Sequence, residues 1–340
     1  MHEEIKNPGL DGASLQKELH LLVAMPALNE ERTVAQVVQS VPREIPGIGR
    51  VDIVVIDDGS DDATADRATA AGAKVIRHPT NRGVGAAFQT ALRHGIECGA
   101  DLIVTLDSDG QFDPGDIPRL IEPIIAGTAD FSSASRFKDP ELVPEMPRIK
   151  LWGNLLMSRI VSRLARQSFY DVSCGMRCYS RLAALRINPL GRFTYTQEVF
   201  LNLAFNQLRV AEIPIPVRGQ REFGSSRVAG NLWRYAMQTS QIILRCYRDY
   251  QPLRFFGGIS LMLAIAAFGL GGMLLVHYLS TGSFTPHKWA GFASMALLAL
   301  ALIMLHTGVI GDMMNRHRVY LEEILYRERV RSKTTRNPRD

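Results

Sequence analysis

The sequence contains little cysteine, and the cysteines it has are not arranged to hold zinc. The four residues show no C-x-x-C spacing and no accompanying cluster of paired histidines: Cys98, Cys174, Cys178 and Cys246. This pattern argues against a zinc site and indicates free thiols in a reducing compartment. Internal repeats and low-complexity tracts are also missing, and the hydrophobic fraction of 46% is that of a globular protein rather than a fibrous or disordered one.

Two long segments lack Asp, Glu, Lys and Arg altogether: Phe255–Leu279 and Trp289–Ile310. A bilayer core of roughly 30 Å needs about 20 helical residues to cross it. A helix in a soluble core rarely stays uncharged on all sides for that length. We therefore predict two transmembrane helices, with a buried helical hairpin as the alternative.

The distribution of charge predicts how these helices are oriented. The first twenty residues are too polar for a signal peptide. Arginines precede the first apolar segment and follow the second, whereas the link 280–288 carries a single basic residue, Lys288. The positive-inside rule then predicts a multi-pass protein of the plasma (inner) membrane, with the catalytic domain and both termini in the cytoplasm. The net charge of +5 lies largely in these flanks and indicates a membrane lipid partner, not nucleic acid.

Short apolar runs alternate with helical patterns in the first half of the chain. The runs are His20–Met25, Val51–Ile56, Lys74–Arg77 and Asp101–Leu106, and the helical patterns are Glu31–Val41, Asp61–Ala71 and Val84–Cys98. This alternation predicts an α/β domain with a mostly parallel sheet flanked by helices. Ligands bind beyond the carboxyl ends of the strands in such sheets, and polar residues follow three of these runs.

Further helices are expected at Arg148–Arg166 and Asn231–Tyr247. The second has an apolar stripe and several arginines, so it suits either the membrane interface or packing on the sheet. We expect five parts in the chain. They are a polar extension (1–19), a cytoplasmic catalytic domain (20–229), a juxtamembrane helix (230–254), a two-helix anchor (255–310) and a basic tail (311–340) whose last ten residues are expected to be disordered.

The strongest local motif is Asp107-Ser108-Asp109-Gly110-Gln111, which directly follows an apolar run. Two carboxylates two residues apart at a strand end can reach one cation. Mg²⁺ or Mn²⁺ typically binds one or two protein carboxylates together with phosphate oxygens of the substrate. An EF-hand calcium loop is excluded because Pro118 stands at the twelfth position, where a Glu is needed. A turn with solvated acids stays open as the alternative.

A second acidic pair, Asp57-Asp58, follows the run Val51–Ile56. A carboxylate at that strand end can accept hydrogen bonds from a nucleobase or ribose, and we assign this role mainly to Asp58, because helix capping explains the polar residues after it. Gly83-Val84-Gly85 lacks the third glycine of a dinucleotide fingerprint, since Phe88 occupies that position. We interpret it as a close-packed helix start that approaches a phosphate or ribose.

Arginines gather at the ends of the later elements, beside Gly and Ser: Arg136, Arg177, Arg221 and Arg227. Single arginines are usually solvated. In a chain that also has an Asp-x-Asp motif, this placement favours phosphate recognition. Glu198, near the start of a predicted helix, either touches the sugar or acceptor or simply interacts with the helix dipole.

Six motifs in this order resemble those of family-2 glycosyltransferases: Pro26…Asn29-Glu30, Asp57-Asp58-Gly59-Ser60-x-Asp62, Asn81-x-Gly83-x-Gly85, Asp107-x-Asp109-Gly110-Gln111, Ser135-Arg136-Phe137 and Arg221-x-x-Gly224-x-Ser226-Arg227. Within that family the chain is similar to dolichol-phosphate mannose synthases and bacterial undecaprenyl-phosphate glucosyltransferases. The similarity extends over about residues 20–250. Arg227 stands where many relatives carry Lys, which keeps the charge.

The resemblance implies a GT-A fold and an inverting transfer of a hexose from a nucleotide-sugar, of the UDP-glucose or GDP-mannose type, to a polyprenyl phosphate. It also suggests a homo-oligomer. We expect metal coordination by Asp107, Asp109 and Gln111, and nucleotide-sugar contacts from Pro26, Asn29, Glu30, Asp58, Gly83 and Asp107. Catalytic roles are expected for Asp109, Arg136 and Arg221, and acceptor or phosphate contacts for Arg177, Glu198, Ser226 and Arg227.

The chemistry of such a transfer asks for cations rather than a base. A phosphate monoester has a second pKa near 6, so its oxygen is already anionic in the cytoplasm. Three alternatives stay open. A processive polysaccharide synthase usually carries a Q-x-x-R-W segment, whereas Asn231-Leu232-Trp233-Arg234 has the wrong order. A nucleotidyltransferase would not need a membrane anchor, and the intact Asp107/Asp109 pair argues against a non-catalytic membrane scaffold.

Overall fold

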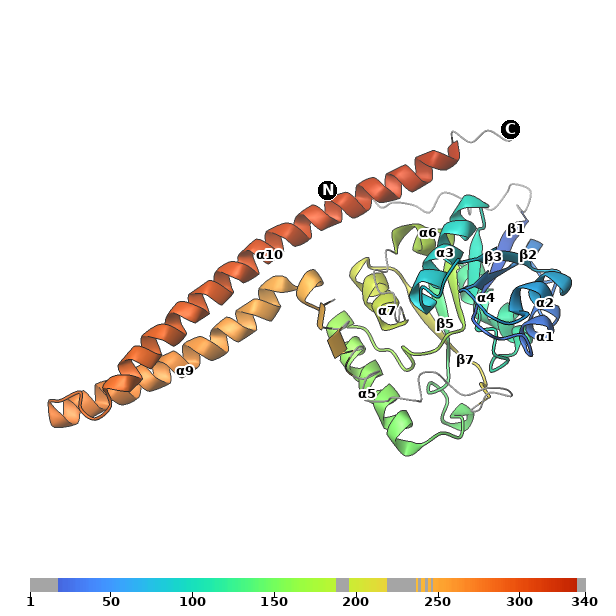
Figure 1. The fold of residues 1–340 in the computed structure, drawn as a ribbon. Helices are drawn as coiled ribbons and strands as arrows, with labels where there is room; N and C mark the ends of the chain where they lie inside the picture. The colour runs from blue at the N-terminus through green and yellow to red at the C-terminus, as the bar shows by residue number, and fades with distance from the viewer. Residues whose placement is uncertain are drawn as a thin grey trace. The chain divides into compact units, whose positions relative to one another are not determined.

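The computed structural model describes residues 18–187, 196–218, 237, 240–241, 244–245 and 247–334 (Figure 1). These residues divide into two compact units. The first unit contains the described residues up to Met146, together with Cys174–Ala184 and 209–218. The second contains Pro147–Ser173, 185–187, 196–208 and the described residues from 237 onward. Residues 1–17 of the polar extension and 12 of the 25 residues of the predicted juxtamembrane helix lie outside the described residues, and the predicted domain boundaries remain predictions.

The first unit is built on a seven-stranded sheet with the order β3-β2-β1-β4-β6-β5-β7. Its strands are β1 (Leu19–Ala27), β2 (Ile48–Asp57), β3 (Lys74–Arg77), β4 (Leu102–Thr105), β5 (Phe131–Ser135), β6 (Arg177–Ser180) and β7 (Val210–Pro214). β1 pairs in parallel with both β2 and β4, and β6 runs antiparallel to its two neighbours. The predicted mostly parallel sheet is therefore confirmed.

Both faces of the central strands are covered, which explains their continuous apolar sequence. Leu21, Val23 and Met25 of β1 belong to a core cluster with α1 (Val34–Gln39), α2 (Thr64–Ala70) and α4 (Ile117–Ile125). On the opposite face, α3 (Val84–Glu97) approaches the sheet so closely that a β-carbon at Gly95 would collide with Ile103. The helices thus fix the strands from both sides, and the loops at the strand ends are left for ligand binding.

The second unit contains α5 (Arg148–Ala165), the last residues of α6 (Arg181–Arg186), α7 (Thr196–Phe205), α9 (Pro252–Thr281) and α10 (Lys288–Thr334). α7 is largely buried, and its Phe200 ring packs edge-on against Phe169, with 4.9 Å between the ring centroids. α9 begins with Pro252, which suits the first turn of a helix. It ends at Thr281, and Gly282 caps it, with a φ of 69° and an N–H bond to the Tyr278 carbonyl that close the last turn.

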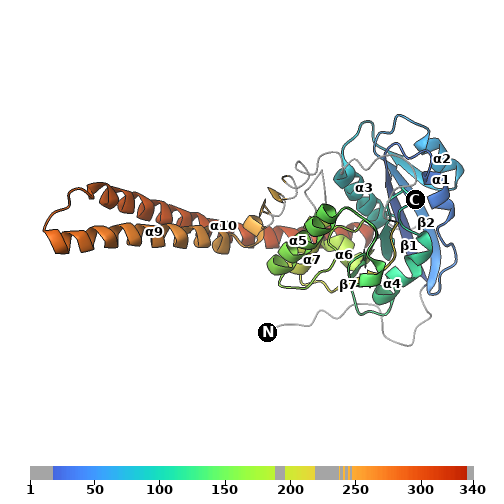
Figure 2. The same ribbon diagram turned by 90° about the horizontal axis from the view of Figure 1, so that it is seen from below.

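α9 and α10 run side by side in both views (Figures 1 and 2). Each contains a stretch long and apolar enough to span a membrane, and only 11% of each stretch is buried within the protein. A core helix of a soluble protein would be mostly buried. The low burial therefore favours the prediction of two spans over a buried hairpin.

The two helices approach closely because small residues line their contact. A β-carbon at Gly291 would meet Leu274, and one at Gly311 would meet Pro252. The Ser260 hydroxyl donates to the Ala301 carbonyl at 2.7 Å, and the Ser294 hydroxyl donates to the Ala267 carbonyl at 2.7 Å. Close packing of small residues and hydrogen bonds from hydroxyl groups stabilise helix pairs in membranes, where the hydrophobic effect does not drive helices together.

α10 continues well beyond the apolar stretch. The sequence turns charged at Asp312, yet the helix ends at Thr334, past the point where α9 begins (Figure 1). We call residues 312–334 the C-terminal extension of α10. Ion pairs between residues four apart support it, such as Arg316 with Asp312 and Arg327 with Glu323.

Candidate active site

The loops after β1, β2 and β4 are joined to one another at the carboxyl ends of these strands. The N–H of Asp58 donates to the Ala27 carbonyl at 2.9 Å. The Ser108 hydroxyl donates to the Pro26 carbonyl at 2.9 Å, and the Thr33 hydroxyl donates to the Ser108 carbonyl at 2.8 Å. The turn containing Asp107 and Asp109 is therefore fastened to the loop after β1, as expected for neighbouring parallel strands.

The loop after β1 is in turn bound to the loop after β2. Asn29 adopts a positive φ of 53°, its N–H donates to the Ser60 hydroxyl at 2.9 Å, and its side-chain oxygen accepts from the Asp61 N–H at 2.9 Å. The N–H of Glu30 donates to the Thr64 hydroxyl at 2.8 Å. These bonds give Asn29 a structural task, and its predicted nucleotide contact remains a prediction, as do those of Pro26 and Glu30.

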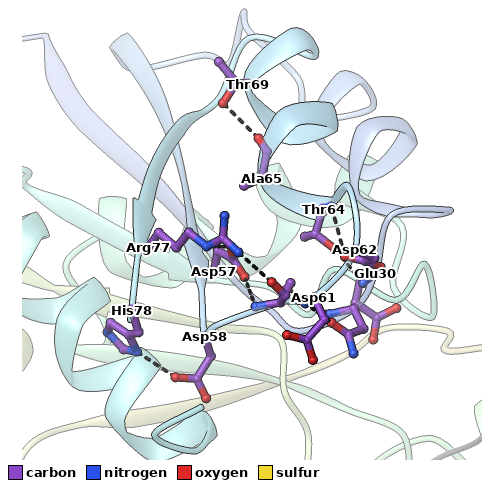
Figure 3. Close-up of polar contacts among 12 residues, drawn as sticks. Glu30, Asp57, Asp58, Asp61, Asp62, Thr64, Ala65, Thr69, Arg77 and His78 are labelled. Carbon is purple, nitrogen blue, oxygen red and sulfur yellow. Dashed lines mark hydrogen bonds and ion pairs between the residues drawn. The ribbon is translucent and has the colours of Figure 1, made fainter. Parts of the chain in front are cut away.

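Asp57 and Asp58 are both buried, and each binds groups from the chain that follows (Figure 3). The Arg77 guanidinium lies 3.2 Å from the Asp57 carboxylate, which also accepts from the Ser60 N–H at 2.9 Å. Asp58 accepts from the N–H groups of Arg82 and Gly83 at 3.0 and 2.8 Å. Its carboxylate thus positions the loop that leads into α3, a task that the sequence did not predict.

His78 is the partner that sequence reasoning missed. Its Nδ1 lies 2.6 Å from the Asp58 carboxylate and its Nε2 lies 3.0 Å from the Thr90 hydroxyl, and the side chain is buried (Figure 3). His78 directly follows β3, which pairs with β2. The sequence alone carries no signal for this contact, because the contact depends on β3 lying beside β2.

Asp107 and Asp109 lie on one tight turn after β4. Asp109 is only 3% exposed, and its carboxylate accepts from the Gln111 N–H at 3.1 Å. Asp107 lies directly against Gly175, where a β-carbon would overlap its carboxylate. Among the described residues no group of three or more His, Cys, Asp and Glu side chains could hold a metal. Two carboxylates completed by substrate phosphates fit Mg²⁺ or Mn²⁺, because these ions are usually bound in that way.

Gln111 connects this turn to the end of the first unit. Its side-chain amide donates to the Arg218 carbonyl at 3.1 Å, and the Arg218 N–H donates to the Gln111 carbonyl at 3.0 Å. The side-chain nitrogen therefore holds backbone, while metal coordination through Gln111 remains a prediction. Residue 218 is the last described residue before the R-x-x-G-x-S-R segment, so the predicted site residues Arg221, Ser226 and Arg227 lie outside the described residues.

The two described arginines of the predicted site have different surroundings. Arg136 directly follows β5 and is half-buried, with its guanidinium carbon 5.0 Å from the centroid of the Phe137 ring. Arg177 is fully buried on β6, where its Nε donates to the Cys174 carbonyl at 2.8 Å. Burial raises the pKa of the neighbouring Tyr179 to about 12, with the Arg177 charge acting in the opposite direction. Arg177 has no exposed surface and supports the 174–176 loop, and its predicted phosphate contact remains a prediction.

Glu198 lies in the second unit, in the first turn of α7, and is 7% exposed. Its neighbour Gln197 is 1% exposed and reaches the Ser173 hydroxyl at 3.5 Å. A buried carboxylate in the first turn of a helix interacts favourably with the helix dipole. The predicted contact of Glu198 with the acceptor remains a prediction.

Comparison with known proteins adds to this geometry. Residues 22–186 match the family model described as glycosyl transferase family 2. The UDP-N-acetylglucosamine–dolichyl-phosphate N-acetylglucosaminyltransferase of Methanococcus voltae is 32% identical over 219 residues, which cover 58% of this chain and 85% of that protein. The undecaprenyl-phosphate 4-deoxy-4-formamido-L-arabinose transferase of Salmonella paratyphi B is 24% identical over 340 residues, covering 94% and 96%.

Among solved structures, glucosyl-3-phosphoglycerate synthase from Mycobacterium tuberculosis in complex with Mn²⁺, uridine diphosphate and glucosyl-3-phosphoglycerate is similar in fold. The TM-score is 0.54 at 22% identity, and the match covers 67% of this chain and 80% of that one. At this identity the likeness concerns the fold alone, and it confirms the GT-A architecture.

Proposed function

This chain belongs to glycosyl transferase family 2, and on that basis we propose that it transfers a hexose from a nucleotide-sugar to a polyprenyl phosphate, with inversion at the anomeric carbon. The relatives described above support the acceptor, since their names specify dolichyl phosphate and undecaprenyl phosphate. Those names specify different sugars. Because the relatives differ in their sugar, we propose in addition that the donor is of the UDP-glucose or GDP-mannose type.

One observation carries the proposal. An Asp-x-Asp turn at the carboxyl end of β4 occurs in the same chain as two helices long and apolar enough to span a membrane. A nucleotide-sugar is water-soluble and a polyprenyl chain dissolves in the bilayer. An enzyme that joins them needs both a polar donor site and a place at the membrane.

The donor site would use a divalent metal. Asp107 and Asp109 would hold Mg²⁺ or Mn²⁺, with Gln111 beside them, and the ion would neutralise charge that develops on the nucleoside diphosphate. The chain's own task is to fix both carboxylates. Thr33 and Ser108 tie the turn to β1, and Gly175 leaves room for the Asp107 carboxylate.

The phosphate groups would be bound by arginines. A guanidinium group can donate two parallel hydrogen bonds to one phosphate group. We therefore assign Arg136 and Arg221 to the donor diphosphate. We assign Arg227, together with Ser226, to the acceptor phosphate. Pro26, Asn29, Glu30 and Gly83 would line the nucleotide. Asp58 would contribute mainly through the loop that it holds before α3.

The reaction would take place on the cytoplasmic face of the membrane. The arginine-rich flanks of both apolar stretches favour this orientation, with both termini in the cytoplasm. Assembly as a homo-oligomer is part of the same proposal.

The direct test uses the full-length protein in bilayer vesicles that contain undecaprenyl phosphate and Mn²⁺. Radiolabelled UDP-glucose, GDP-mannose and UDP-N-acetylglucosamine are supplied separately, and label is counted in the organic extract. We expect one donor to label the lipid and EDTA to stop the reaction. Label in a polymer or a soluble product would indicate another acceptor, and no transfer from any donor would favour a non-catalytic scaffold.

A further inference from the structure

The C-terminal extension of α10 is fastened to the helical layer of the second unit at two places. The first is the end of α6. The Arg186 guanidinium pairs with Glu323 at 3.0 Å, and its central carbon lies 4.1 Å from the centroid of the Tyr326 ring. Glu323 and Tyr326 are three residues apart and so share one face of α10. One arginine is therefore bound by both a carboxylate and an aromatic ring of the extension.

Arg329 adds to the same contact, and here the arginine belongs to α10 and the accepting group to α6. Its guanidinium donates to the carbonyl of Leu185 at 2.8 Å, in the last turn of α6. A cation is favourable at that end of a helix, because the last carbonyls have no partner within the helix. The Arg329 side chain is half-buried at this contact.

The second place is Tyr250, just before α9. Its ring stacks on Phe205, the last residue of α7, with 4.4 Å between centroids and 19° between the planes. The Arg318 guanidinium carbon lies 3.5 Å from the centroid of the same ring, and the Asn315 side chain donates to the Tyr250 carbonyl at 3.2 Å. Tyr250 thus joins α7 to the extension at a point about 12 Å along α10 from Tyr326.

Two contacts this far apart restrain both the position and the direction of the extension. We propose that Arg186 is a positioning residue: with Glu323, Tyr326 and Arg329 it locks the end of α6 to the helix that leaves the membrane, so that the helical layer of the second unit, which carries Glu198 on α7, is held at a set height above the bilayer. The inference rests on the proposed function. It adds that the hairpin is a rigid support that delivers a membrane-embedded acceptor, and not a loose tether.

The physical reason is geometric. The headgroup of a polyprenyl phosphate is confined to the membrane surface. A loosely held helical layer would meet it in many orientations, whereas a held one meets it in few. Effective concentration depends steeply on such geometry, and small misplacements of reacting groups lower rates strongly. An acceptor that diffuses in water does not depend on the height of this layer.

The experiment compares two acceptors with the full-length protein in vesicles of phosphatidylethanolamine and phosphatidylglycerol. One is undecaprenyl phosphate in the bilayer, and the other is a short, water-soluble prenyl phosphate. We expect Arg186→Glu to lower kcat/KM for the bilayer acceptor by about tenfold or more, and for the soluble acceptor by less than about twofold. The charge exchange Arg186→Glu with Glu323→Arg should restore most of the loss.

Arg316→Glu is the matched control, because Arg316 is 69% exposed and pairs with Asp312 of its own helix. It should leave both acceptors unchanged. An equal loss on both acceptors in Arg186→Glu, or no loss on either, would overturn the inference.

A second measurement does not depend on turnover. Hydrogen exchange of the amides in 318–331 should be faster in Arg186→Glu than in the unaltered protein, and unchanged in Arg316→Glu. Unchanged exchange in Arg186→Glu would refute the proposed contact even if the chain transferred no sugar. Failure of the unaltered protein with both acceptors would count against the proposed function, and the exchange data would still decide this inference.

Discussion

The carboxylate of Asp107 lies against the backbone of Gly175, so that no side chain fits at position 175 without moving it. The Gly175 carbonyl is also within 3.4 Å of the Thr105 hydroxyl, and the neighbouring Cys174 carbonyl is bound by the buried Arg177. The loop that faces Asp107 is therefore fixed from two sides. It holds one carboxylate of the proposed metal site in place.

Gly175→Ala should consequently weaken metal binding. The added methyl displaces the Asp107 carboxylate, and changes beside a metal ligand typically cost 10- to 100-fold in affinity. We expect the affinity for Mn²⁺ in the presence of UDP, measured by calorimetry, to fall by about tenfold. Gly153→Ala is the control, because nothing lies within 4 Å of a β-carbon at that position of α5. Equal affinities in the two variants would contradict the role of Gly175.

Asp109→Asn should abolish turnover while the protein stays folded. The amide oxygen can still accept the Gln111 N–H bond, so the turn is kept, but the charge that a divalent ion needs is lost. We expect kcat to fall at least about 100-fold, equivalent to about 2.7 kcal/mol of transition-state stabilisation. Thermal melting serves as the check on folding. Activity close to that of the unaltered protein would remove Asp109 from the metal site.

Asp58→Ala should lower the free energy of unfolding more than a substitution in a loop usually does. The variant leaves His78 and the N–H groups of Arg82 and Gly83 without their buried acceptor. We expect a loss of about 3 kcal/mol, or roughly 6–12 °C in Tm. Asp61→Ala, an exposed neighbour, should change stability by less than about 0.5 kcal/mol. If the two variants melt alike, the loop before α3 does not depend on Asp58.

The Asp130–Arg209 pair should make stability depend on acidic pH. Burial raises the pKa of Asp130, but hydrogen bonds and the charge of Arg209 outweigh this effect and hold the pKa below its usual range. The carboxylate is thus bound more strongly in the folded than in the unfolded chain. Its contribution is complete above the unfolded value and disappears as the pH falls through the lower folded pKa. Arg209→Met should therefore lower Tm at pH 6 and flatten the fall of Tm between pH 5 and pH 3. Parallel curves for the two proteins would contradict this.

The sequence predicted the sheet best in the first half of the chain, where short apolar runs alternate with helical patterns. Lys74–Arg77 was expected as a strand and is β3, and the expected helix Val84–Cys98 differs from α3 by one residue. β6 was not predicted, because its sequence Arg-Cys-Tyr-Ser has no apolar pattern. It is a strand only because it is inserted between β4 and β5, which is a long-range effect.

In the candidate site, too, features that are local in sequence could be predicted, and contacts that depend on the tertiary structure could not. Asp107 and Asp109 could be found from the sequence, because their motif and the strand before it are adjacent. The contact between Asp58 and His78 could not, since it depends on β3 lying beside β2. The surroundings of Arg177 could not be predicted for a related reason: a charged residue suggests the surface, and only tertiary structure reveals its burial and the Cys174 carbonyl that accepts its hydrogen bond.

The close contact between α9 and α10 has a consequence for protein engineering. The hydroxyls of Ser260 and Ser294 are satisfied within the pair, and Gly291 and Gly311 bring the backbones together. The pair therefore needs no further helix to complete its hydrogen bonds at these positions. Residues 252–311 should be transplantable as a module that anchors an unrelated soluble domain and returns its own C-terminus to the side of the bilayer from which it started.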